Sequence, residues 1–146
     1  MNPEIEDRFA DGQLKLMDED FEESIAIFTE ILESDPSCAR VYQARAVAKL
    51  RSDDLAGAMK DIDEAIKCEP ENYRFHYHKG AMLFQHGAAD EAVESVSRAI
   101  GLAPEFAPAY FLRSKIYEKL GDEESSGVDL NKAITLRKQQ TTVVDF

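Results

Sequence analysis

The sequence has no tryptophan, two cysteines among 146 residues, and no apolar run near the ~20 residues that a membrane span needs. The acidic start lacks the basic and then apolar order of a secretory signal. Cys38 and Cys68 form neither a C-x-x-C motif nor a metal-type array, so we predict two free thiols. These absences together predict a soluble cytoplasmic protein.

Positive charge is also scarce, because 17 Lys and Arg stand against 29 Asp and Glu, which gives a net charge of −12. Nucleic acids and anionic membrane surfaces attract basic proteins, and their phosphates repel an acidic one. The balance therefore predicts no nucleic-acid partner and no membrane partner.

What the sequence does contain is a repeat. Pro36, Pro70 and Pro104 lie thirty-four residues apart, and the same step joins Phe28 and Ile62 to further apolar residues. A period of this size, with amphipathic segments and without strand-like runs, is typical of a helical solenoid. We predict one domain over 1–146, with repeats at 5–38, 39–72, 73–106 and 107–140 and a tail at 141–146.

Each repeat contains two predicted helices, a first helix (A) and a second helix (B), separated by a turn. Asp20, Asp54 and Asp122 suit the N-cap of a B helix. Gly87 and Gly121 suit a left-handed exit from an A helix. Small residues recur where the A and B helices would cross, which predicts close helix approach. The predicted crossing residues are Gly12, Ala46, Gly80 and Ser114 on the A helices and Ser24, Ala58, Ala92 and Ser126 on the B helices.

The same positions carry a family resemblance. In this pattern, a residue with a large ring is followed four positions later by a small residue. At fixed distances after it come an Ala, a large apolar residue, a second Ala and a Pro. In the third repeat these residues are His76, Gly80, Ala92, Val96, Ala99 and Pro104. The chain resembles four tandem tetratricopeptide repeats. The resemblance implies an all-α fold, a right-handed α-solenoid (superhelix) of four helix-turn-helix repeats with about eight helices.

The fourth repeat departs from the pattern. Lys138 replaces the proline, so we expect the last helix to run on through Arg137 and Gln139. A polar cap helix is missing, and we expect partly exposed apolar residues that would allow self-association. These residues are Val128, Leu130, Ile134 and Leu136.

The resemblance also implies that the A helices line a concave groove. In repeats two to four these helices are rich in Lys and Arg, while the B segments are acidic. A groove with arginines and aromatic rings suits a protein or peptide segment with acidic and apolar side chains. The alternative is that these charges solvate an exposed face and complement the neighbouring acidic helices. The predicted groove residues are Phe9, Gln13, Arg40, Gln43, Val47, Arg51, Arg74, Tyr77, His78, Phe84, Phe111, Lys115 and Lys119.

We therefore predict a noncatalytic protein–protein interaction scaffold. One alternative is a structural module that self-assembles through the uncapped fourth repeat. A minor alternative is a co-chaperone that binds chaperone tails, as relatives do with convergent Lys, Asn and Arg side chains. Of the five matching positions here, Arg74 keeps the charge reliably. The five positions are Phe9, Gln13, Ala44, Arg74 and His78.

Catalysis, cofactors and metals find no support in the sequence. His76, His78 and His86 lack the i, i+3 or i, i+4 spacing of ligands on one helix. No phosphate loop or nucleophile elbow is present. We expect no enzyme activity, no cofactor and no metal. A last hypothesis is that the tail 141–146, which ends in Asp145 and Phe146, enters a basic groove of its own chain or of a neighbour.

Overall fold

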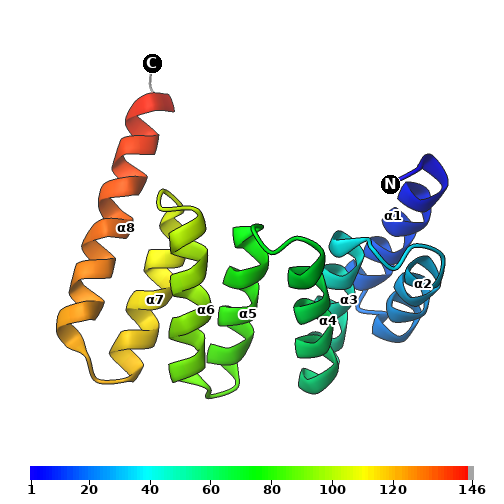
Figure 1. The fold of residues 1–146 in the computed structure, drawn as a ribbon, viewed down its shortest axis with the longest axis horizontal. Helices are drawn as coiled ribbons and strands as arrows, with labels where there is room; N and C mark the ends of the chain where they lie inside the picture. The colour runs from blue at the N-terminus through cyan, green and yellow to red at the C-terminus, as the bar shows by residue number, and fades with distance from the viewer. Residues whose placement is uncertain (145–146) are drawn as a thin grey trace. The chain divides into compact units, whose positions relative to one another are not determined.

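The computed structural model describes residues 1–144, with side chains through Thr141, as eight α-helices without a strand (Figure 1). The all-α repeat fold that the sequence predicts is confirmed. The helices are α1 (Pro3–Met17), α2 (Phe21–Ser34), α3 (Ala39–Arg51), α4 (Leu55–Cys68), α5 (Tyr73–Gln85), α6 (Ala89–Leu102), α7 (Ala107–Lys119) and α8 (Glu123–Val144).

The chain divides into two compact units, Met1–Pro70 (unit 1) and Glu71–Phe146 (unit 2), each with two helical hairpins. Three A helices begin at Ala39, Tyr73 and Ala107, the first residues of the predicted repeats. That all four repeats form one domain stays a prediction.

Unit 1 is built around aromatic and branched side chains. Each helix from α1 to α3 packs against the next one along the chain. Phe9 and Phe28 lie in the core with ring centres 5.6 Å apart, beside Ile31 and Val41. A Cβ at Gly12 would collide with the Phe28 ring, so α1 can lie this close to α2 because residue 12 has no side chain.

The helices of unit 2 also cross closely, with smaller side chains at the crossings. A Cβ at Gly80 would collide with Val96, so α5 and α6 cross closely. At the next crossing, the Ser114 hydroxyl donates to the Ser126 carbonyl oxygen at 2.9 Å, and the Ser126 hydroxyl donates to the Ser114 carbonyl oxygen at 2.9 Å. The small residues predicted at these helix crossings therefore do allow close approach.

The predicted N-caps of the B helices are confirmed. The side chains of Asp20, Asp54 and Asp122 accept hydrogen bonds from backbone N–H groups three residues later, at 3.3, 2.9 and 3.1 Å. Each bond satisfies a backbone donor that the helix start leaves without an intrahelical partner.

The turns between the A and B helices share a left-handed residue. Gly87 and Gly121 have φ of 84° and 81°, as predicted. The equivalent residues of unit 1 are Glu19 and Asp53, with φ of 61° and 68°. Unit 1 thus makes the same turn with residues that carry a Cβ, at a conformational cost that glycine avoids.

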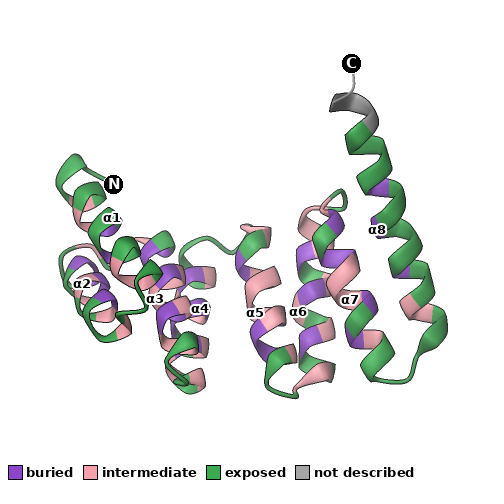
Figure 2. Cartoon of the chain, turned by 180° about the vertical axis from the view of Figure 1, so that it is seen from behind, coloured by how far each residue is buried: buried purple, intermediate pink, exposed green. Residues whose placement is uncertain are grey.

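Helix α8 has 22 residues, against 14 in each of α2, α4 and α6. Lys138 can continue a helix where the other repeats have proline, so the predicted extension is confirmed. Much of the α8 surface is exposed (Figure 2). Leu136, however, is buried with Ala107 and Tyr110, so its predicted exposure is wrong.

Three further sequence predictions concern the cysteines, a membrane span and the C-terminal tail. Cys38 and Cys68 are free thiols, as predicted. Within residues 1–144, no helix combines the length and the apolar character that crossing a bilayer requires. The tail is helical up to Val144, but the hypothesis that it docks in a groove concerns side chains from residue 142 onward, which lie outside the described part.

Candidate functional site

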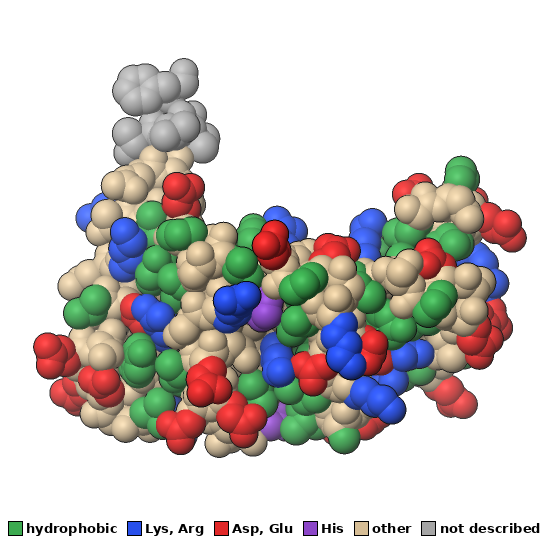
Figure 3. All heavy atoms as spheres, viewed as in Figure 1, with side chains coloured by type: hydrophobic (Ala, Val, Ile, Leu, Met, Phe, Trp, Pro, Cys, Tyr) green, Lys and Arg blue, Asp and Glu red, His purple; other side chains and the backbone are tan. Residues whose placement is uncertain are grey.

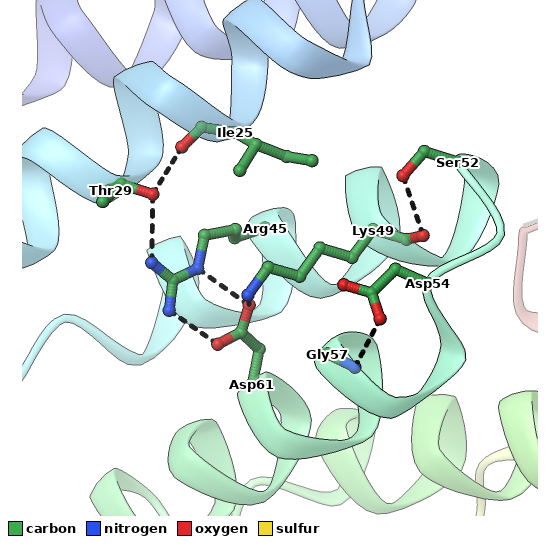
Figure 4. A network of polar contacts seen from close by, with 8 residues as sticks. All are labelled: Ile25, Thr29, Arg45, Lys49, Ser52, Asp54, Gly57 and Asp61. Carbon is green, nitrogen blue, oxygen red and sulfur yellow. Dashed lines mark hydrogen bonds and ion pairs between the residues drawn. The ribbon is translucent and has the colours of Figure 1, made fainter.

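Two basic residues of α3, Arg45 and Lys49, point into a hydrogen-bonded network (Figure 4). The Arg45 Nε and Nη2 atoms donate to the two carboxylate oxygens of Asp61 at 2.8 and 2.7 Å. Lys49 Nζ lies 3.0 Å from the same carboxylate, which is almost fully buried. Arg45 Nη1 also donates to the Thr29 hydroxyl of α2 at 3.1 Å, so the network joins both hairpins of unit 1.

Unit 2 contains the same network two repeats later. Arg113 donates from Nε and Nη2 to the Asp129 carboxylate at 2.7 and 2.8 Å. Its Nη1 donates to the Ser97 hydroxyl of α6 at 3.1 Å. Bidentate pairing of this kind fixes geometry as well as charge.

These contacts narrow the basic face that the sequence predicts on the A helices of repeats two to four. Arg45, Lys49 and Arg113 have their charges neutralised by buried carboxylates of the B helices. Arg51, a predicted groove residue, pairs with Glu19 at 3.0 Å and lies over the Phe21 ring. For Arg45, Lys49 and Arg113, the alternative that the charges complement neighbouring acidic helices holds. The pair between Arg51 and Glu19 is exposed, so a groove role for Arg51 stays a prediction.

A pocket in unit 2 combines basic and aromatic groups. It has a volume of about 440 Å³ and lies between α5, α7 and α8. Among the described residues that line it there is no Asp or Glu. The lining residues are Tyr77 from α5; Ala107, Pro108, Phe111, Leu112 and Lys115 from α7; and Arg137 and Gln140 from α8.

The local fold holds the pocket's rings and cations in place. The Tyr77 ring meets the Phe106 ring edge-on, with centres 5.2 Å apart. Burial raises the pKa of the Tyr77 hydroxyl, which therefore stays protonated at neutral pH and can donate a hydrogen bond. Lys115 Nζ lies 5.4 Å from the centre of the Phe111 ring. The Gln140 amide donates to the backbone oxygen of Glu105 at 3.3 Å, which ties α8 to the loop before α7.

His78 lies beside Tyr77, with ring centres 5.6 Å apart. Burial lowers the pKa of His78, and the positive charge of Arg74 lowers it further. The imidazole is therefore neutral at pH 7 and can accept a hydrogen bond. Arg74 itself is exposed and donates from Nε to the Tyr73 hydroxyl at 3.4 Å.

The structure brings three predicted groove residues, Tyr77, Phe111 and Lys115, into one pocket. Phe9 is a correction: it is 3% exposed because it fills the core against Phe28, with the Arg40 guanidinium 4.8 Å above its ring. A partner cannot use Phe9 as a contact surface. Of the remaining predicted residues, Gln13 is exposed on α1, Gln43 and Val47 are half-buried on α3, Phe84 is half-buried on α5, and Lys119 is exposed on α7. Their role in binding stays a prediction.

Arg137 and Gln140 line the pocket but are not among the predicted groove residues. The available signal was Lys138, because a residue that lets α8 continue also carries residues 137 and 140 to the start of α7. Among residues 1–144 there is no group of three or more His, Cys, Asp or Glu that could hold a metal.

Comparison with known proteins places these features in a family. Models described as tetratricopeptide repeat match residues 9–68, 44–107 and 107–140. The chain is similar to the mitochondrial import receptor subunit TOM70 of Mus musculus, at 31% identity over 77% of this chain and 19% of that protein. It is also similar to the SGT1 homolog of Oryza sativa subsp. japonica, at 26% identity over 80% of this chain and 32% of that protein.

A third similar protein is the small glutamine-rich tetratricopeptide repeat-containing protein 2 of Saccharomyces cerevisiae, at 24% identity over 94% of this chain and 39% of that protein. The chain thus spans less than half the length of these relatives. Among solved structures, the crystal structure of MamA has a TM-score of 0.87 at 20% identity, over 94% of this chain and 81% of that one. This likeness shows the α-solenoid fold.

Proposed function

The chain belongs to the tetratricopeptide repeat family, and from this premise we propose that it is a noncatalytic scaffold that binds a partner protein through the pocket of unit 2. The proposed ligand is a protein or peptide segment with an acidic side chain next to an apolar or aromatic one. The observation that carries the proposal is the convergence of Lys115 and Arg137 on a pocket walled by Tyr77 and Phe111.

The chemistry of the pocket supports this ligand class. Lys115 and Arg137 supply charged donors for a carboxylate. Tyr77, Phe111 and Leu112 supply apolar surface for a ring or an aliphatic side chain. The buried pairs that neutralise Arg45, Lys49 and Arg113 do not include the pocket's two cations, Lys115 and Arg137, which favours recognition of acids at this pocket.

The relatives support a protein partner. One is named as a mitochondrial import receptor subunit. Since the chain spans part of each relative, its partner, its process and its cytoplasmic location are proposals. Binding along the rest of the predicted groove, including Gln13, Arg40, Gln43, Val47 and Arg51 in unit 1, is a wider form of the same proposal.

The first experiment selects ligands without assuming a partner. A displayed random peptide library is panned on the immobilised chain, and the selected peptides are measured by fluorescence polarisation. We expect enrichment of Asp or Glu beside an aromatic or branched residue. Affinity should fall with rising salt, because exposed charges are screened.

Charge reversals then locate the binding site. Lys115→Glu and Arg137→Glu should each weaken the selected peptides by about tenfold or more, which corresponds to at least ~1.4 kcal/mol. Lys132→Glu is the matched control, since Lys132 is exposed on α8 and does not line the pocket. Equal losses in all three variants, or retained affinity in the two pocket variants, would reject the pocket as the site. Arg40→Glu and Arg74→Glu test the wider groove in the same assay.

A further inference from the structure

A second pocket of unit 2 adjoins the pocket that Lys115 and Arg137 line, which we call the basic pocket. The second pocket has a volume of about 500 Å³ and is lined by Tyr73 of α5, residues 102–106 and Gln140 of α8. Gln140 lines the basic pocket as well. The two pockets therefore meet at one side chain, and a single ligand can enter both.

The second pocket has the opposite charge. Glu105 is the acid in its lining, and there is no Lys, Arg or His among the described lining residues. The Glu105 side chain is exposed, and none of the side chains that the structure describes forms an ion pair with it. The basic pocket, by contrast, has two cations and no acid among its described lining residues. The neighbouring pockets therefore favour groups of unlike charge.

Helix α6 ends at the second pocket, and its C-terminal end adds partial negative charge there. Pro104 has no N–H, and the Phe106 N–H donates to the Ala103 carbonyl oxygen at 3.0 Å. The described loop after α6 therefore donates no backbone hydrogen bond to the carbonyl oxygens of residues 100–102. Such a helix end favours a nearby cation. The last turn of α4 has its own cation, Lys67, whereas the last turn of α6 has no basic residue.

Aromatic rings form another part of the wall. The Tyr73 and Phe106 rings meet edge-on with centres 4.9 Å apart, and the faces of such rings attract cations. Arg74 donates from Nε to the Tyr73 hydroxyl at 3.4 Å but does not line the pocket. Its positive charge opposes a second cation nearby. Replacement of Arg74 by a neutral residue should therefore strengthen the binding of a cation.

Hydrogen bonds hold the loop of the second pocket in place before a ligand arrives. The Tyr110 hydroxyl donates to the Pro104 carbonyl oxygen at 2.8 Å. The Gln140 amide donates to the Glu105 carbonyl oxygen at 3.3 Å. The proline ring restricts the same loop further. A site that is already ordered loses less conformational entropy when it binds, so weak attractions suffice to fill it.

Glu105 is separated from the main acidic surface of unit 2. Figure 3 shows acidic side chains gathered at the turn between α7 and α8. Glu105 precedes α7, so the 13 residues of this helix, about 20 Å in length, lie between Glu105 and that turn. A control at the turn, such as Glu124, can therefore distinguish binding in the second pocket from a general attraction of cations to an acidic surface.

We propose that the second pocket binds a Lys or Arg side chain of the same peptide whose acidic side chain enters the basic pocket. This inference rests on the proposed function and narrows its ligand to a segment with an acid and a base a few residues apart, since the pockets meet at Gln140. Glu105, the end of α6 and the Phe106 ring each attract the cation. A second acid at that place in the peptide is repelled.

The first test uses peptides selected on the chain. We expect panning to enrich Lys or Arg a few residues from the acidic one. Replacement of that base by norleucine, which has no charge, should weaken binding about three- to tenfold in fluorescence polarisation. Glu105→Lys should weaken the basic peptide but not the norleucine peptide, and the control Glu124→Lys should change neither. No enrichment of a base, or equal losses for the two peptides in Glu105→Lys, overturns the inference and leaves the proposed function standing.

The second test needs no peptide. N-acetyl-lysine N-methylamide is titrated into the isotope-labelled full chain and followed by NMR, with the norleucine analogue as the control ligand. We expect saturable shifts at Tyr73 and residues 102–106 with the lysine compound. Glu105→Gln should weaken this binding about threefold, and Arg74→Gln should strengthen it. Absent shifts, equal shifts with the two compounds, or shifts unaffected by Glu105→Gln overturn the inference.

The two proposals fail in different ways. Lys115→Glu removes a cation of the basic pocket and should not abolish the shifts that the lysine compound causes, because Lys115 does not line the second pocket. If panning selects no peptide while the lysine compound binds, the proposed function fails and the cation site stands. If acidic peptides bind without preference for a base and the lysine compound causes no shifts, the cation site fails and the proposed function stands.

Discussion

Units 1 and 2 have the same pair of hairpins but distribute their polar residues differently. The buried carboxylate of unit 1, Asp61, receives two cations, Arg45 and Lys49. Its counterpart in unit 2, Asp129, receives Arg113, and a tyrosine stands where unit 1 has Lys49. Unit 2 in turn has glycines at its left-handed turn positions and all three histidines of the chain.

The difference shows that one structural period can carry two patterns of charge. Backbone and apolar positions repeat every thirty-four residues, because the hairpins have the same shape. The arginine–aspartate networks recur two repeats apart, at Arg45 and Arg113. The repeat between them has Lys79 and Ser95 at the corresponding positions. Whether an arginine forms an ion pair therefore depends on the residue opposite it in its own hairpin. The shape of the hairpins, by contrast, is the same in every repeat.

The largest expected effect comes from removal of a network carboxylate. Asp61→Ala leaves Arg45 and Lys49 partly buried without their acid, and we expect it to cost about 3–5 kcal/mol of unfolding free energy. Asp129→Ala should cost less, since one cation loses its partner there. Urea denaturation measures both. Glu64→Ala, which removes an exposed pair with Lys67, is the control and should change stability by less than ~0.5 kcal/mol. Equal stability of Asp61→Ala and the unchanged chain would contradict a structural role for the network.

An intermediate effect is expected at the turns. Gly87→Ala places a Cβ at φ 84° and should destabilise the chain by about 1 kcal/mol. Asp53→Gly relieves the same strain at φ 68° and should stabilise it by about 0.5–1 kcal/mol. Thermal denaturation of the two variants compares the units directly. Changes of the same sign would show that the two turns are not equivalent.

The smallest expected effect is the pH dependence of unit 2 through His78. Its folded-state pKa is lowered by burial and by Arg74, while the unfolded chain has the ordinary value near 6.5. The unfolded state therefore binds the proton more readily, and stability falls as the pH drops below about 6.5. Denaturation midpoints at pH 7.5 and 5.5 should differ less in His78→Gln than in the unchanged chain. An identical pH dependence in both would remove His78 as the cause. Hydrogen bonds to Ser37 and Ser125 lower the pKa values of Asp35 and Asp122. These two carboxylates therefore affect stability at a more acidic pH than His78 does.

Much of the fold was predictable because the signals were local. The aspartate caps, the glycines at Gly87 and Gly121, and the proline stops each depend on the conformation of a few residues. The crossing positions could also be predicted, since a residue without bulk recurs wherever two helices approach. Lys138 in place of proline predicted the longer α8 in the same way.

The site was less predictable because the sequence shows how many charges a helix carries but not which carboxylate lies beside each one. Arg45 and Arg113 resemble Arg74 in the sequence, but bidentate pairing with Asp61 and Asp129 takes them out of the exposed basic surface. Phe9 occupies a groove position of the repeat pattern, but its ring fills the core beside Phe28. Arg137 and Gln140 are not predictable as pocket residues, because the repeat pattern assigns no groove role to the end of a B helix.

The sequence by itself determined where the turns between paired helices lie, because the aspartate caps and the glycines at these turns act on their immediate neighbours. The tertiary structure decided which cations remain available to a ligand, because that depends on a carboxylate sixteen residues away being carried back against them by a helical hairpin. How far a side chain is exposed depends on the residues that pack against it, and no local sequence pattern specifies those residues.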